Sequence, residues 1–221
     1  TLSEFDDTLL EQLIEDVAPE KSLIYRDLHD EFGSDQISPV LLGAGDRENG
    51  GIFKHANMMA AAAMLQAAKS VKSEALSERL TRTAYWVIDC ILPYRTLKSP
   101  YEICGNPRLC TQYNNSETGE NIGPTLSGTS TWLLLCLFAG FGIEFTSEAL
   151  ILEPILRPED TSEDITVNTG KASYHIVAEK PAGFRRYGAG SSITCDGVPV
   201  SDRRVPIFED GRQHEVRVIL G

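Results

Sequence analysis

Residues 45–57 read G-D-R-E-N-G-G-I-F-K-H-A-N, and residues 58–69 continue as M-M-A-A-A-A-M-L-Q-A-A-K. The second segment is rich in alanine, a strong helix former, and predicts a buried helix that packs closely on several sides. In the first, the pair Gly50-Gly51 permits backbone conformations that other residues avoid and lets a ligand approach closely. His55 is expected at or near the helix N-terminus, where free amide groups and the helix dipole favour an anion. The same residues also fit a plain loop-to-helix turn with one exposed ion pair and one hydrogen-bonded histidine.

The first two thirds of the chain predict helices separated by long polar connections. Residues 6–17 and 72–91 carry apolar side chains at helical spacing. Residues 93–126 are a polar connection rich in Asn, Glu, Thr and Gly, too long to be filler in a compact domain. A further apolar helix opens at Ser127, a good N-cap, and Gly128 lets the first-turn amides face a ligand. A plain N-cap with no ligand is the alternative for these two residues.

After Gly142 the pattern changes to short β-branched runs separated by Gly-rich turns, which predicts a small antiparallel sheet domain. We therefore expect an α+β multidomain chain, with a helical domain over residues 1–144 and a sheet domain over 145–221. His175 and His214 fall within strand patterns and are expected to be structural or surface histidines. The expected strands are residues 149–155, 164–167, 172–178, 192–195 and 215–220.

Composition narrows the classes of function. With 32 Asp and Glu against 20 Lys and Arg, the net charge of −12 disfavours nucleic acid and anionic membrane surfaces as partners. The five cysteines have no compact repeating spacing and predict free thiols in a reducing, cytoplasmic compartment. Cys104 and Cys110 lack neighbours at metal-ligand spacing, so we expect no metal site and no bound cofactor. No apolar run approaches the roughly 20 residues that span a bilayer.

Several stretches together resemble the inverting phosphorylases of glycoside hydrolase family 94, and most closely the branch that acts on β-1,2-linked oligoglucans. The matching stretches are R-E-N-G-G-I-F-K-H-A-N (47–57), C-T-Q-Y (110–113), G-E-N (119–121) and S-G-T-S-T-W (127–132), followed by F-G-I-E and I-L-E-P. Their order and spacing are more specific than any one of them. The resemblance implies the last helices of an (α/α)6 catalytic barrel, followed by a C-terminal two-layer antiparallel β-sandwich.

The resemblance also implies roles for individual residues. His55, Ser127 and Gly128 correspond to the residues that bind phosphate, and Arg47, Glu48 and Gln112 to residues that contact the glucosyl unit. Inorganic phosphate is then a co-substrate, and β-linked gluco-oligosaccharides are the other. A homodimer is compatible with this reading.

One expected residue is absent from the chain. The general acid of the family is an aspartate that lies farther upstream of the histidine than residues 1–54 allow, so no catalytic residue is assigned here. We expect the chain to be the C-terminal part of a phosphorylase, with the rest of the enzyme upstream. Three alternatives stay open: the phosphorylase-like module of a cyclic β-1,2-glucan synthase, a non-catalytic carbohydrate-binding fragment, and a hydrolase that uses Glu117 or Glu120 with water.

Overall fold

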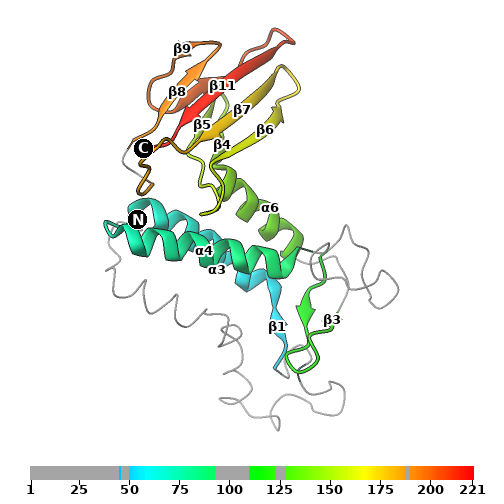
Figure 1. Cartoon of the computed structure of the whole chain (residues 1–221). Coiled ribbons are helices and arrows are strands. Elements are labelled where there is room, and N and C mark those ends of the chain that lie inside the picture. Colours follow the sequence, from blue (N-terminus) through cyan, green and yellow to red (C-terminus); the bar gives the residue numbers. More distant parts are fainter. Residues whose placement is uncertain (1–44, 46–49, 93–109, 123–127, 188–189) are drawn as a thin grey trace. The chain divides into compact units, whose positions relative to one another are not determined.

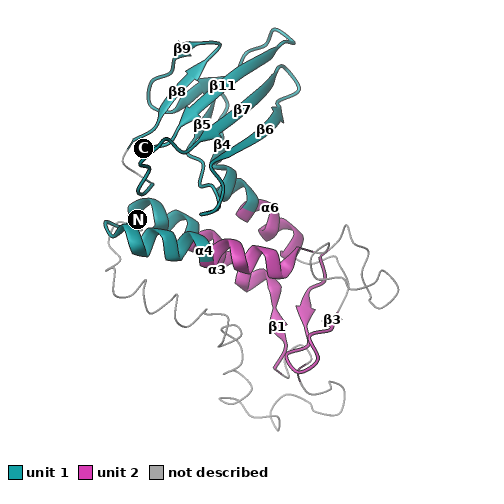
Figure 2. Ribbon diagram, in the orientation of Figure 1, with its two compact units in different colours: residues 1–4, 65–82, 137–221 teal, residues 5–64, 83–136 magenta. Residues whose placement is uncertain are grey.

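The computed structural model of the chain describes residues 45, 50–92, 110–122, 128–187 and 190–221 (Figure 1). The expected helix over residues 6–17 lies outside this range. The chain divides into two compact units, which Figure 2 colours separately. The described part of unit 1 comprises residues 65–82, 137–187 and 190–221, and that of unit 2 comprises residues 45, 50–64, 83–92, 110–122 and 128–136. The division groups residues by contact, and the expected boundary after residue 144 stays a prediction.

Three helices are described: α3 (Lys54–Ser70), α4 (Glu74–Ile91) and α6 (Gly128–Phe141). All three were expected from their apolar patterns, but α3 begins four residues before Met58, because the helix follows β1 directly with no breaker between them. The Ser73 hydroxyl accepts a hydrogen bond from Leu76 N at 3.2 Å and so caps the start of α4. The expected apolar face of α4 is buried, apart from the exposed Ala75. Its buried members are Leu76, Leu80, Ala84, Val87 and Ile88.

A small antiparallel sheet in unit 2 was not expected from the sequence. Its strands are β1 (Ile52–Phe53), β2 (Tyr113–Asn114) and β3 (Asn121–Ile122), in the order β1-β2-β3. Each is only two residues long, so no strand periodicity is visible in the sequence. Within the polar connection that we expected over residues 93–126, the structure describes residues 110–122, and these contain a β-hairpin formed by β2 and β3.

Unit 1 contains a second antiparallel sheet of three strands. These are β4 (Ile143–Phe145), β5 (Ala149–Leu152) and β10 (Arg204–Pro206), in the order β10-β5-β4. Gly142 precedes β4 with a φ of 60° and its carbonyl accepts a hydrogen bond from Glu153 N at 2.7 Å. The F-G-I-E and I-L-E-P stretches are therefore in direct backbone contact.

The largest sheet, also in unit 1, is mixed rather than antiparallel, so that expectation was wrong for it. Strand β11 runs parallel to β7 on one side and antiparallel to β8 on the other. Side chains alternate between buried and accessible along β7 and β11, so one face of the sheet is buried. The parallel pair β7–β11 is joined by the long connection that parallel strands need, here residues 180–212. The antiparallel expectation failed because strand patterns in the sequence do not show which strands become neighbours. The strands, in the order β6-β7-β11-β8-β9, are β6 (Ser162–Asn168), β7 (Ser173–Glu179), β8 (Ser192–Cys195), β9 (Val198–Pro199) and β11 (Gln213–Ile219).

The chain therefore has the expected α+β class. Tyr174 links two sheets of unit 1, because its hydroxyl donates to Pro206 O at 3.0 Å and accepts from Phe208 N at 2.7 Å. Within the part of the chain that the structure describes, no helix is both long and apolar enough to cross a membrane.

Candidate functional site

Three of the stretches that carry the family resemblance come together at the start of α3. Phe53 of the first stretch pairs with Tyr113 of the second, and Tyr113 also pairs with Ile122, which directly follows the third. The amide of Lys54 donates to Gln112 O at 3.2 Å, so the first turn of α3 is fixed to the second stretch. Residues about sixty positions apart in the chain therefore form one backbone framework around the helix N-terminus.

The buried side chain of Lys54 joins the same three stretches through hydrogen bonds. It is only 2% exposed, and its ammonium group donates to Thr111 Oγ1 at 2.6 Å and to Asn121 Oδ1. The Thr111 hydroxyl in turn donates to Asn121 Oδ1 at 2.9 Å. Burial lowers the pKa of Lys54 to about 8, so the group is still mostly protonated at neutral pH. A positive charge is therefore held among neutral oxygen partners, one residue before His55.

His55 lies in the first turn of α3, as expected. Its half-buried ring meets the ring of Phe53 edge-on, with 5.6 Å between the centroids. Phe53 packs in the same manner on Tyr113, with 4.4 Å between the centroids. These contacts orient the imidazole from β1 and β2. First-turn amides and the helix dipole make this end of α3 favourable for an anion.

The other expected site residues are divided between described and undescribed parts of the chain. Arg47, Glu48 and Ser127 lie outside the described residues. Gly128 is the exposed first residue of α6, and the following Thr129 is fully buried. The structure brings Gln112 to the start of α3 through its backbone carbonyl, while no hydrogen bond among the described residues joins Gly128 to His55 or to Gln112.

The two acids of the hairpin loop are exposed. Glu117 and Glu120 lie between β2 and β3, where Asn115 Oδ1 accepts hydrogen bonds from the amides of Glu117 and Thr118 at 2.8 and 3.0 Å. Asn115 therefore shapes the turn, and neither acid is enclosed.

A cavity of about 160 Å³ adjoins Lys54, and Asn57 also lines it. Asn57 is fully buried, and its Nδ2 donates to Phe53 O at 2.7 Å. Among the described residues its Oδ1 has no hydrogen-bond partner, which is unusual for a buried oxygen. A ligand hydroxyl or a water that donates to this oxygen would be stabilised here.

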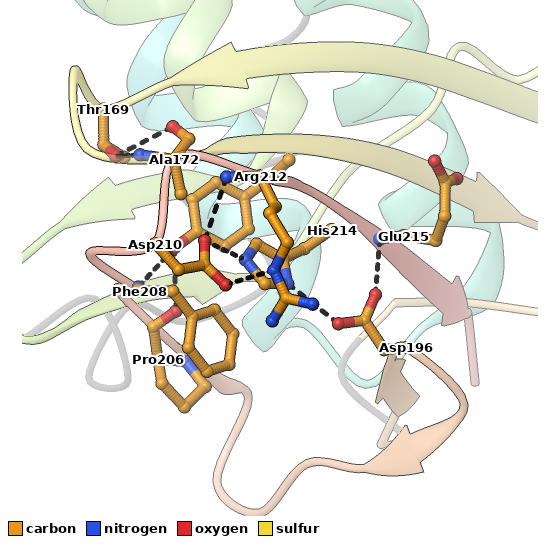
Figure 3. Close-up of polar contacts among 10 residues, drawn as sticks. Thr169, Ala172, Asp196, Pro206, Phe208, Asp210, Arg212, His214 and Glu215 are labelled. Atoms are coloured by element: carbon orange, nitrogen blue, oxygen red, sulfur yellow. Dashed lines mark hydrogen bonds and ion pairs between the residues drawn. The ribbon is translucent and has the colours of Figure 1, made fainter.

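The sheets of unit 1 hold a second polar cluster around His214 (Figure 3). His214 is 2% exposed, its Nδ1 lies 2.8 Å from Asp196 Oδ2, and its Nε2 lies 3.2 Å from Asp210 Oδ1. Its ring stacks on Phe208 at 4.2 Å between centroids. The hydrogen bond to Asp196, with the charge of both carboxylates, raises the pKa of His214.

The ligand atoms of Cys195, Asp196 and His214 lie within 4.8 Å of one another, which is close enough to hold a metal ion. Both nitrogens of His214, however, already contact carboxylates. Burial also raises the pKa of the Cys195 thiol, which disfavours the thiolate that a metal would need. The geometry therefore fits a structural role for His214, as the strand pattern predicts.

Comparison with known proteins is informative for only a short segment. No family model matches the chain. A segment of 49 residues is 47% identical to the elongation factor G-like protein of Synechocystis sp. (strain ATCC 27184 / PCC 6803 / Kazusa). The segment is 22% of this chain and 7% of that protein. The matching segment thus covers only a small fraction of the length of that relative.

Reasoning from the sequence missed Lys54. The available signal was a lysine directly after the apolar pair Ile52-Phe53, at the start of an alanine-rich helix. A charged side chain at that point must either reach solvent or find buried partners. Its partners come from the two stretches that join it through β2 and β3. They could be identified only once the hairpin was known.

Proposed function

We propose that the chain is the C-terminal part of an inverting glycoside phosphorylase. The enzyme cleaves β-linked gluco-oligosaccharides, of β-1,2 linkage, with inorganic phosphate and releases α-glucose 1-phosphate. In this proposal the helices belong to an (α/α)6 barrel and the sheets of unit 1 form a β-sandwich, whose layers the Tyr174 hydroxyl connects.

The observation that carries the proposal is the framework at the start of α3. Three sequence stretches, recognised independently of the structure, are hydrogen-bonded to one another around a helix N-terminus that carries a histidine. A plain loop-to-helix turn does not require partners about sixty residues away. The buried ammonium of Lys54 adds a local positive charge, which a phosphate site needs on a chain of net charge −12.

The roles that the resemblance implies are compatible with the chemistry of phosphorolysis. Phosphate is itself the nucleophile, so the protein needs no base to activate water. His55, Ser127 and Gly128 hold the phosphate on one face of the sugar, and Arg47, Glu48 and Gln112 hold the glucosyl unit. The bond from the anomeric carbon to the leaving oxygen breaks as a bond to a phosphate oxygen forms, and an upstream aspartate protonates the leaving oxygen. Positioning of this kind can supply several kcal/mol of the barrier reduction.

The test is release of α-glucose 1-phosphate from β-1,2-linked glucose oligosaccharides, with and without phosphate. It compares the 221-residue chain with the longest product of its gene. We expect phosphate-dependent release by the longer product alone. Phosphate-independent sugar release would contradict the mechanism and favour a hydrolase, whereas sugar binding without turnover would favour a carbohydrate-binding fragment. A long membrane-spanning region upstream would favour the synthase module.

Variants of the longer product test the role of His55. His55→Ala should raise the Michaelis constant for phosphate by about tenfold or more, the effect of losing roughly one charge-assisted hydrogen bond, with a smaller change for the oligosaccharide. His175→Ala is the matched control, because this histidine lies on the sheet of unit 1 and contacts Glu215 at 2.7 Å. Equal losses for phosphate and oligosaccharide would contradict the assigned role.

A further inference from the structure

We propose that a pocket in unit 1, separate from the start of α3, binds a small organic phosphate. Its volume is about 430 Å³, and it is formed by the first turns of α4 together with the loops before β6 and after β7. Small-molecule sites typically enclose about 300–1,000 Å³. The pocket is therefore large enough for a ligand of several heavy atoms.

The charges that line this pocket have the opposite sign to the chain as a whole. Among the described residues, the cations Lys180, Arg185 and Arg186 line it, against one acid, Glu78. The acids Glu159 and Asp160 are not part of the lining, although their charge acts on Lys180. Glu78 is already paired, because Arg82 Nη2 lies 2.8 Å from its Oε1. The pocket thus has a positive surplus on a chain of net charge −12, which favours an anionic ligand.

Two of these cations donate hydrogen bonds to backbone carbonyls. Lys180 donates to the carbonyls of Arg157 and Pro158, the latter at 3.3 Å. Arg186 Nη1 donates to Val71 O and Tyr187 O, both at 3.3 Å. Backbone carbonyls fix the position of a cation without neutralising it, and the remaining guanidinium nitrogens present the planar fork that suits phosphate oxygens.

Arg185 is held less tightly. It lies 3.7 Å from Glu74, and its side chain is 77% exposed. A long exposed side chain in such a weak contact can turn towards an anion at low cost. Arg185 is therefore the residue whose replacement should weaken binding with the least disturbance of the fold.

Phe184 supplies an apolar wall beside the cations. The Lys180 ammonium lies 5.9 Å from the centroid of its ring, and Tyr187 packs on it at 5.0 Å between centroids. Most ligand pockets combine such an apolar surface with a few polar groups that fix orientation. We infer that the ligand is a phosphate monoester whose organic part is a compact ring that rests on Phe184.

The experiment is a calorimetric titration of the 221-residue chain with glucose 1-phosphate and, separately, with inorganic phosphate. Both are titrated into the His55→Ala variant, so that binding at the start of α3 does not contribute. We expect saturable binding of glucose 1-phosphate in this background. The proposed function depends on His55, so binding of glucose 1-phosphate to the His55→Ala variant would test this pocket independently of the proposed function.

Two pairs of substitutions provide the comparison. Replacing Lys180 and Arg185 by glutamine should weaken binding at least tenfold, since roughly 1.4 kcal/mol corresponds to a factor of ten and a charge-assisted bond contributes about that much or more. Replacing Lys72 and Arg79 by glutamine removes the same charge from exposed positions outside the pocket and should leave the affinity unchanged. Absence of saturable binding, or equal weakening by both pairs, would overturn the proposal.

A third variant tests the apolar wall. Phe184→Ala should weaken binding of glucose 1-phosphate more than binding of inorganic phosphate. Equal effects on the two ligands would overturn the inference that the ligand carries a ring.

Discussion

Replacing Gly142 by alanine tests how helix α6 is joined to the sheets of unit 1. A Cβ on Gly142 would lie 2.0 Å from the carbonyl carbon and oxygen of Glu153 and 2.3 Å from Pro154 N, all of them backbone atoms. The backbone must therefore separate, which places two hydrogen bonds at risk: Glu153 N to Gly142 O and Ile155 N to Gly140 O, both 2.7 Å long. Each contributes about 1 kcal/mol, and a left-handed alanine costs about 1–2 kcal/mol more. The expected loss is about 3–4 kcal/mol in the free energy of unfolding.

Gly170→Ala separates the contact from the backbone conformation. Gly170 has a φ of 81°, also left-handed, but a Cβ there would meet no atom of the described residues within 4 Å, apart from its own chain neighbours. It should lose only the conformational part, about 1–2 kcal/mol. Urea unfolding followed by circular dichroism measures both variants. Equal losses for the two would refute the reasoning, because the close approach of Gly142 to Glu153 would then contribute nothing.

Two further predictions concern buried charges. Lys54→Met should raise the Michaelis constant for phosphate in the longer gene product. It should change the free energy of unfolding by only about 1 kcal/mol, because Thr111 and Asn121 still bond to each other and the cost of burying the ammonium disappears. A large stability loss with unchanged phosphate kinetics would contradict this prediction. The pKa of Lys54 is about 8 in the folded chain, against an ordinary lysine value of 10.5. The unfolded chain therefore binds more protons between these values, so wild-type stability should rise with pH there, and this rise should be absent in the variant. For His214 the sign is opposite: its pKa is raised above 6.5 by Asp196, so the stabilisation is complete below that value and is lost as pH rises through the folded pKa. The difference in urea midpoint between wild type and His214→Gln should shrink over that range, and a difference independent of pH would argue against the ion pair.

The long elements of this chain could be predicted from the sequence because their periodicity is visible over many residues. The apolar face of α4 and strand β7 (Ser173–Glu179), expected over residues 172–178, follow directly from such patterns. The strands of unit 2 could not be predicted in this way, since each has two residues and depends on a partner elsewhere in the chain. Pairing between distant segments is a property of the folded chain, and local propensity does not encode it.

The candidate site shows the same division. The position of His55 at the start of α3 could be predicted, because an alanine-rich helix after two glycines has a recognisable beginning. The role of Lys54 could not, since its oxygen partners come from residues 111 and 121. The pocket around Lys180 was also missed, because its cations are scattered through a chain with an acidic total. Sequence patterns thus locate where a helix begins more readily than which side chains meet.

The central place of β11 has a consequence for the order in which unit 1 folds. This strand, Gln213–Ile219, separates β7 from β8, although both precede it in the chain. During synthesis, β7 and β8 therefore emerge with their inner edges unpaired until β11 follows. Contacts between residues so far apart in sequence form slowly, and open strand edges invite pairing with other chains. We expect the sheet to form late and in a single step, after β11 has been synthesised. The incomplete chain should be most prone to aggregation before that point.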